Sequence, residues 1–383
     1  MKFSPKKIIP QIIALLVLFL IFGYLTYNAQ INMGNRNMEF GYDFLARESS
    51  FDIQFSLIEY SRSSSYARAY LVGLINTILV AVTGIIFATI LGVIIGIARL
   101  SSNFLIRKSS DIYVEFFRNV PLLLQIFFWY YAALRVLELP QNTEGLFNSF
   151  YLTIKALYTP SLTWTNLNFF IYALIFSFIS IIILKIYSKK VQENKGKQIP
   201  IFYISLLILT FIPGLAFLFG DVEFTINYPV LTKLSETSYS FENGLAIPPE
   251  FIALVLALSL YTATFIAECV RAGILGISKG QKEAAASLGL NQKQILKLIV
   301  MPQALRIIIP PTTNQYLNLT KNSSLAAAIA YPDVVLVFAG TALMQTGKAI
   351  EIVTITMFTY LSLSISISIF MNWYNKKIEI KEK

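Results

Sequence analysis

Long apolar runs, separated by shorter polar and charged segments, dominate the chain. Several of them approach or exceed the roughly 20 apolar residues that a helix needs to cross the hydrocarbon core of a bilayer. They lie near residues 8–27, 71–98, 120–137, 169–186, 200–219, 251–270, 304–319 and 352–371. The pattern predicts an all-α integral membrane protein with about eight transmembrane helices.

The composition supports a membrane protein. Of 383 residues, 56% are hydrophobic and 14% are charged, and the mean hydropathy is +0.63, which excludes an ordinary soluble domain. The net charge of +10 is therefore no sign of nucleic-acid binding, and membrane lipid is the expected surrounding. With no histidine and a single cysteine, Cys269, we expect no metal site, no cofactor and no intramolecular disulfide.

The distribution of lysine and arginine predicts the orientation. If both termini and the segments 99–119, 185–198 and 271–306 face the cytoplasm, that side holds 22 of the 31 basic residues but only 6 of the 21 acidic ones. The first apolar run follows a basic start, as in a signal peptide. It is longer than a typical signal-peptide core and lacks a clear cleavage site, which favours a retained anchor. The remaining segments 28–70, 138–168 and 220–250 are expected to form small caps outside.

Residues 278–302 form a polar, helical stretch between two apolar runs. Ser278 followed by Gln281 is a capping-box pattern, and Gly289 suits the left-handed residue that ends a helix. Asn291 can cap a second helix that ends before Pro302. The pattern predicts two short helices joined at a tight corner on the membrane surface.

This corner resembles the ATPase-coupling loop of permease subunits in bacterial ABC importers. The residues that carry the likeness are Glu283, Ala284, Ala285, Gly289, Ile299 and Pro302, with Met301 where the family usually has leucine. In that family the loop docks on a separate cytoplasmic ATPase. The chain has no GxxxxGK[ST] stretch of its own, so we expect a transport subunit rather than an enzyme.

Other stretches between residues 73 and 333 are similar to the polar amino acid permeases. They are Gly73, Asn76 and Thr77; residues 117–125 (FRNVPLLLQ); Ala267, Glu268, Arg271 and Gly273; and Lys321–Leu325 (KNSSL). The likeness implies a five-helix permease core made of the second, third, sixth, seventh and eighth spans. The first span is then an N-terminal addition, and a helix pair at about 165–220 is an insertion.

The expected organisation is an N-terminal helix and outer segment (1–70), a permease domain (71–375) and a cytoplasmic tail (376–383). The long chain and its insertion resemble the Q-type permeases of general L-amino acid ABC transporters. That resemblance implies a second homologous permease, an ABC ATPase dimer, a periplasmic amino-acid-binding protein and a bacterial inner membrane. It also implies broad amino-acid specificity, although the sequence identifies neither the amino acids carried nor the residues that touch them.

Polar residues inside the spans are candidates for the translocation pathway because they are costly in hydrocarbon. They are Glu268, Asn314, Gln315, Asn318, Lys321, Ser323 and Ser324. Glu268 can pair with Arg271 or attract a substrate ammonium. Lys321 can line the path or simply extend to the outer surface. Pro310 and Pro311 are expected to interrupt this helix and free backbone carbonyls.

Three other functions are compatible with these residues. One is an ABC permease for another small polar solute, and one is a scaffold subunit that transports nothing. A third is a transporter driven by an ion gradient, with Glu268 and Lys321 as relay groups, which predicts inverted internal repeats. No convincing repeat is found in the sequence.

Overall fold

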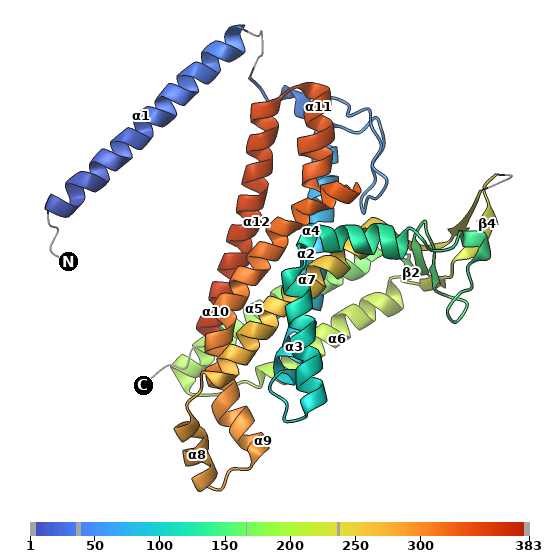
Figure 1. The fold of residues 1–383 in the computed structure, drawn as a ribbon. Helices are drawn as coiled ribbons and strands as arrows, with labels where there is room; N and C mark the ends of the chain where they lie inside the picture. The colour runs from blue at the N-terminus through green and yellow to red at the C-terminus, as the bar shows by residue number, and fades with distance from the viewer. Residues whose placement is uncertain (1–4, 36–39, 166, 236–237, 379–383) are drawn as a thin grey trace. The chain divides into compact units, whose positions relative to one another are not determined.

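The computed structural model describes residues 5–35, 40–165, 167–235 and 238–378. Seven of its helices are long and apolar enough to cross a membrane. They are α1 (Pro5–Asn35), α2 (Tyr66–Ala98), α5 (Leu167–Lys195), α6 (Ile201–Phe219), α7 (Pro249–Leu275), the helix built around α10 (Met301–Asn322), and α12 (Ala349–Ile378) (Figure 1). The predicted all-α membrane protein is confirmed.

The predicted third span differs from a full membrane helix. Residues 122–134 form a shorter apolar helix, in which α4 (Leu122–Phe127) continues into the π-helical turns of η2 (Phe128–Leu134). A second short apolar helix, residues 335–346, consists of η6 (Val335–Ala342) and α11 (Leu343–Thr346). The number of membrane-length helices in the described ranges is thus one below the expected figure of about eight.

The helix around α10 is longer than its apolar run. It begins at α9 (Gln292–Gln294), continues through η4 (Ile295–Val300) and α10, and ends with η5 (Ser323–Ile329), 38 residues in all. Two predictions were therefore wrong: the helix neither ends before Pro302 nor is interrupted at Pro310 and Pro311. Pro302 lies at the junction where the π-helical turns of η4 give way to α10, and the helix also passes through both later prolines.

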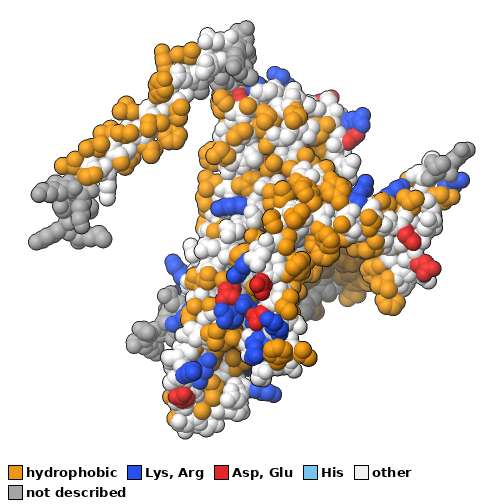
Figure 2. All heavy atoms as spheres, viewed as in Figure 1, with side chains coloured by type: hydrophobic (Ala, Val, Ile, Leu, Met, Phe, Trp, Pro, Cys, Tyr) orange, Lys and Arg blue, Asp and Glu red, His pale blue; other side chains and the backbone are white. Residues whose placement is uncertain are grey.

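The chain divides into two compact units, of which the first comprises residues 1–123 and 254–383. Within it, α10 packs against α2 and α12. One cluster of its core joins η1 (Asp43–Ala46) to three other elements through Phe44, Tyr66, Val334, Phe338, Ala342 and Ile352. Outward-facing positions of α12 are apolar, for example Ile365, Ile369 and Phe370. Apolar side chains also cover much of the surface in Figure 2, as expected for helices that face lipid.

The second unit, residues 124–253, contains the helix pair α5 and α6, which pack against each other. Its strands are β1 (Tyr151–Leu152), β2 (Leu157–Trp164), β3 (Phe224–Asn227), β4 (Val230–Lys233), β5 (Tyr239–Glu242) and β6 (Gly244–Ile247), and a short helix, η3 (Pro140–Asn142), precedes them. Strand β2 pairs antiparallel with β1, β3 and β6, and β4 pairs with β5. Two of the expected caps therefore fold together as a small sheet.

Candidate functional site

The polar stretch at 278–302 folds as a corner at the end of α10 opposite to α11 (Figure 1). Helix α8 (Lys279–Ser287) is followed by Leu288 and then Gly289, whose φ of +79° is left-handed as predicted. Asn291 then caps the next helix in a capping box with Gln294, and both hydrogen bonds measure 2.9 Å. The capping box at Ser278 was wrong, because the Ser278 side chain makes no cap hydrogen bond.

The residues of the predicted coupling motif divide between the inside and the outside of this corner. Ala285 is buried, and α8 packs on η4, while Ile299 and Pro302 are half-buried. Glu283, Ala284 and Gly289 are exposed. Leu288, which sequence reasoning missed, is 83% exposed at the tip. The corner thus presents one projecting apolar side chain beside the small residues Ala284 and Gly289.

Glu268 belongs to a cluster of four charges that joins three helices. Its carboxylate accepts hydrogen bonds from Arg99 at 2.5 Å and from Arg271 at 2.7 Å. Arg99, at the end of α2, also bonds Asp111 of α3 (Phe104–Asn119) at 2.7 Å. The pairing with Arg271 was one of the two predicted roles of Glu268. Arg99 and Asp111 were missed because their contacts depend on how α2 and α3 fold back.

The candidate pathway residues on α10 lie mainly on one face. Asn314, Asn318 and Lys321 are all exposed, and their spacing of four and three residues forms a single stripe along the helix. Gln315 is half-buried. Ser323 is buried and donates a hydrogen bond to the Thr320 carbonyl at 2.7 Å. The structure therefore places Ser323 in the core, away from the exposed stripe.

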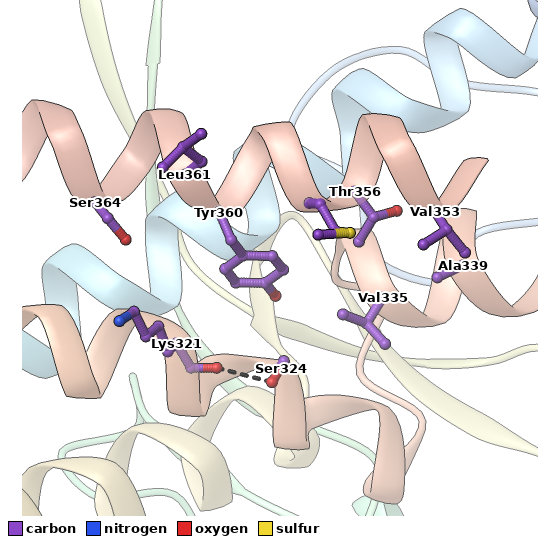
Figure 3. A pocket seen from close by; sticks show the side chains of 10 residues that line it. Lys321, Ser324, Val335, Ala339, Val353, Thr356, Tyr360, Leu361 and Ser364 are labelled. Atoms are coloured by element: carbon purple, nitrogen blue, oxygen red, sulfur yellow. Dashed lines mark hydrogen bonds between the residues drawn. The ribbon is translucent and has the colours of Figure 1, made fainter. Parts of the chain in front are cut away.

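A groove of about 560 Å³ lies between the end of α10 and α12. Lys321 and Ser324 form one side, and Thr356, Tyr360 and Ser364 of α12 lie opposite (Figure 3). The remaining wall is largely apolar: Val335, Ala339, Val353, Met357 and Leu361. The α12 residues were missed because an isolated hydroxyl in an apolar run carries no signal of which cavity it faces.

These groups do not form a metal centre. Within the part of the chain that the structure describes, no three His, Cys, Asp or Glu side chains come together as possible metal ligands. The arrangement instead offers a surface corner, a polar stripe on a membrane helix and a groove at the end of that stripe. It defines a multi-pass membrane protein of the permease class.

Comparison with known proteins identifies the family. The family model "Binding-protein-dependent transport system inner membrane component" matches residues 197–380. The chain is 46% identical to the general L-amino acid transport system permease protein AapQ of Rhizobium johnstonii, over 100% of this chain and 94% of that protein. The chain belongs to the family of amino-acid ABC transporter permeases.

Two further relatives cover nearly the whole chain. The putative amino-acid ABC transporter permease protein YhdX of Escherichia coli is 45% identical over 97% of this chain and 94% of its own length. The glutamate/glutamine/aspartate/asparagine transport system permease protein BztB of Rhodobacter capsulatus is 38% identical over 99% of this chain and 95% of its own. The likeness thus includes the N-terminal helix α1 and the helix pair α5 and α6.

Proposed function

We propose that this chain forms one half of the membrane pore of an ATP-driven importer for L-amino acids of broad specificity. A periplasmic binding protein delivers the substrate, a second homologous permease completes the pore, and an ABC ATPase dimer supplies the energy. The observation that carries the proposal is the exposed corner at 278–302, in a chain similar over its full length to a general L-amino acid permease.

The corner is the ATPase-docking element in this proposal. Ala284 has a small side chain and Gly289 has none, so another protein can approach the backbone closely at these exposed positions. The Leu288 side chain projects beside them. Helix α8 packs against η4, and within this corner Ala285 is buried and Ile299 is half-buried. Because η4 continues directly into α10, a displacement of the corner is transmitted along a single helix. The ATPase can thereby move the helix that carries the polar stripe.

The stripe Asn314, Asn318 and Lys321 is the translocation surface in this proposal. Side-chain amides and an ammonium facing hydrocarbon are costly, so such a stripe needs protein or water against it. The second permease, packed across a water-filled path, supplies both. The exposed corner then lies on the cytoplasmic side of the bacterial inner membrane, as do both termini.

Glu268 has a structural role in this scheme. Its two arginine partners satisfy the carboxylate and leave little capacity to attract a substrate ammonium. The four-charge cluster instead fastens α2, α3 and α7 at the end near the corner, where Figure 2 shows charges of both signs together.

A narrower substrate range is the second candidate. The relative BztB is named for glutamate, glutamine, aspartate and asparagine, which differ only in size and in amide against carboxylate. A permease of that kind carries few apolar amino acids. The two candidates predict different substrate panels.

The test is uptake of labelled L-amino acids into proteoliposomes that contain this chain, its partner permease, the ATPase and the binding protein. The proposal predicts ATP-dependent uptake of acidic, polar and apolar amino acids. Uptake restricted to the acidic residues and their amides favours the narrower candidate. Uptake that follows an imposed ion gradient without ATP contradicts the importer.

A further inference from the structure

The groove between α10 and α12 contains one charge. Lys321 is exposed at the end of the stripe, and no hydrogen bond or ion pair joins its Nζ to any other residue in the described ranges. The lining holds no carboxylate. An anionic group in the groove therefore finds an ammonium with its hydrogen-bonding capacity unused.

The hydroxyl groups of the groove have a complementary property. Ser324 donates to the Lys321 carbonyl at 2.7 Å, Thr356 donates to the Ile352 carbonyl at 2.8 Å, and Tyr360 donates to Asp333 at 3.3 Å. Each hydroxyl hydrogen is thus used within the protein. The oxygens of Ser324 and Thr356 can still accept, whereas the Tyr360 oxygen already interacts with the buried Ser323 and Thr77. The groove presents one cationic donor and several neutral acceptors, which is the complement of a zwitterion.

We propose that this groove binds the common part of L-amino acids, the α-carboxylate on Lys321 and the α-ammonium on the hydroxyl oxygen of Ser324. The inference rests on the proposed function and names its substrate subsite. Lys321 lies 19 residues beyond Pro302, about 28 Å along a helix, so the site lies toward the outer mouth of the path.

The apolar wall accounts for breadth of substrate. Val335, Val353 and Met357 offer the side chain no hydrogen bonds, so they select weakly among neutral side chains. The volume of about 560 Å³ falls within the range of ordinary ligand pockets and leaves room for large side chains. With a single positive charge and no carboxylate in the lining, cationic amino acids are bound least well.

The alternative is that Lys321 only extends to the membrane surface. A lysine near the end of a span does this without any matching set of acceptors. The two roles predict different results for ligands that lack a carboxylate. If Lys321 only extends to the surface, removing the carboxylate from an amino acid does not change binding, whereas the proposed site requires that carboxylate.

The experiment uses the purified complex of both permeases and the ATPase, without binding protein. Binding of labelled L-leucine and L-glutamine is measured with competition by isopentylamine, which is leucine without its carboxylate. We expect isopentylamine not to compete. Lys321→Gln lowers affinity on the order of tenfold, the worth of one charge-assisted hydrogen bond, and Lys321→Arg restores most of it. Lys190→Gln, an exposed lysine of α5, is the control.

A steric pair tests the location. Ser364 lines this groove, whereas Ser366, two residues along α12, lines a different one with Tyr42 and Tyr70. Ser364→Trp should abolish binding of both amino acids, and Ser366→Trp should leave it intact. The complex is checked by co-purification of the second permease with each variant.

The outcomes separate this inference from the proposed function. Wild-type complex that transports with ATP, together with unchanged binding in Lys321→Gln, overturns the subsite alone. Loss of the second permease from Ser364→Trp also overturns it, because the groove is then a subunit contact. Absence of ATP-dependent uptake in the wild type overturns the proposed function itself.

Discussion

Gly289 is the residue at which the corner turns. Its φ of +79° is left-handed, and a Cβ at this position meets nothing within 4 Å, so glycine is needed for its backbone and not for space. Gly289→Val should therefore strain the corner, by roughly 1–2 kcal/mol or more, because β-branched residues avoid this conformation. Gly289→Asn should be tolerated, because asparagine adopts it several-fold more often than most residues.

The measurement for this pair is ATP-dependent uptake relative to ATP hydrolysis in the reconstituted complex. We expect Gly289→Val to lower uptake per ATP hydrolysed and Gly289→Asn to stay close to wild type. Equal behaviour of the two variants speaks against the corner geometry as the coupling element. Such a result would mean that coupling to the ATPase does not depend on the backbone conformation at Gly289.

Asp333 is a buried carboxyl in the short segment between η5 and η6, outside the seven candidate spans. Burial raises the pKa of Asp333 to about 7, although the Leu336 N–H and the Tyr360 hydroxyl donate to it. The folded state thus favours the protonated form. The contribution of the Asp333 carboxyl to the free energy of unfolding is complete below its pKa in the unfolded state. This contribution is lost as the pH rises through its pKa in the folded state.

Asp333→Asn should remove this pH dependence, because an amide stays neutral and its oxygen can still accept from Leu336. Melting temperatures between pH 5 and 8 should fall for the wild type and fall less for the variant. The shift corresponds to at most about 4 kcal/mol. Asp52→Asn is the control: Arg62 holds the pKa of Asp52 below its ordinary value, so its contribution is lost toward acid pH. A parallel decline in Asp333→Asn and wild type contradicts the assignment.

At the residue scale, the predictions that succeeded were local. Gly289 and Asn291 could be assigned because left-handed glycines and capping boxes are set by neighbours in sequence. The partner Arg99 of Glu268 lies 169 residues away and could not be found in this way. The burial of Ser323 depended on how η5 turns after α10, which hydropathy does not encode.

Helix α2 approaches α7 closely at Gly92 and Gly96. A Cβ at Gly96 would lie 2.7 Å from Val270 Cβ and 2.8 Å from the Ala267 carbonyl oxygen. Small residues allow membrane helices to approach in this manner, since packing and not burial from water holds them together. Gly96→Val should force α2 and α7 apart and destabilise the protein by about 1–3 kcal/mol.

The measurement is the thermal stability of detergent-purified protein, followed by size-exclusion chromatography. Gly214→Val is the matched control, because a Cβ at Gly214 in α6 meets nothing within 4 Å. We expect a lower unfolding temperature only in Gly96→Val. Equal stability of the two variants contradicts the tight contact.

At the element scale, apolar runs located every long helix but not all their ends. The helix around α10 extends well beyond its apolar run because Asn291 caps α9 and α8 packs on η4. The sheet was missed for a different reason. Strand β2 pairs with β6, which lies more than 80 residues away in sequence, with Leu157 opposite Ile247. A local hydropathy pattern does not predict pairing over such a distance.

At the scale of the whole molecule, the segment that contains the helix pair α5 and α6 begins and ends at adjacent points. Trp164 and Phe224 are paired across β2 and β3, and the Thr165 N–H donates to the Glu223 carbonyl at 3.0 Å. Helices α5 and α6 lie between these two strands in sequence. A chain that leaves a sheet and returns beside its point of departure can be shortened without moving what flanks it.

Replacing residues 166–222 by Asn-Gly should therefore close β2 and β3 into a hairpin, because this dipeptide favours the two-residue turn that antiparallel strands accept. Two spans are lost together, so the side on which α7 and the corner lie should not change. The shortened chain should insert, assemble with its partner permease and keep most of its ATP-dependent uptake. Replacing only 198–222 removes one span and should place the basic corner on the wrong side, against the positive-inside rule.

The readout for both deletions is labelling of Ser287→Cys by a membrane-impermeant maleimide, in a Cys269→Ser background that removes the only native thiol. Inside-out vesicles should label the wild-type length and the double deletion, whereas the single deletion should label only in right-side-out vesicles or fail to accumulate. If the double deletion inserts correctly but cannot transport, α5 and α6 are part of the pore or of a subunit contact rather than a peripheral addition. If it cannot insert at all, the sheet that joins β2 to β3 depends on the helix pair for its folding.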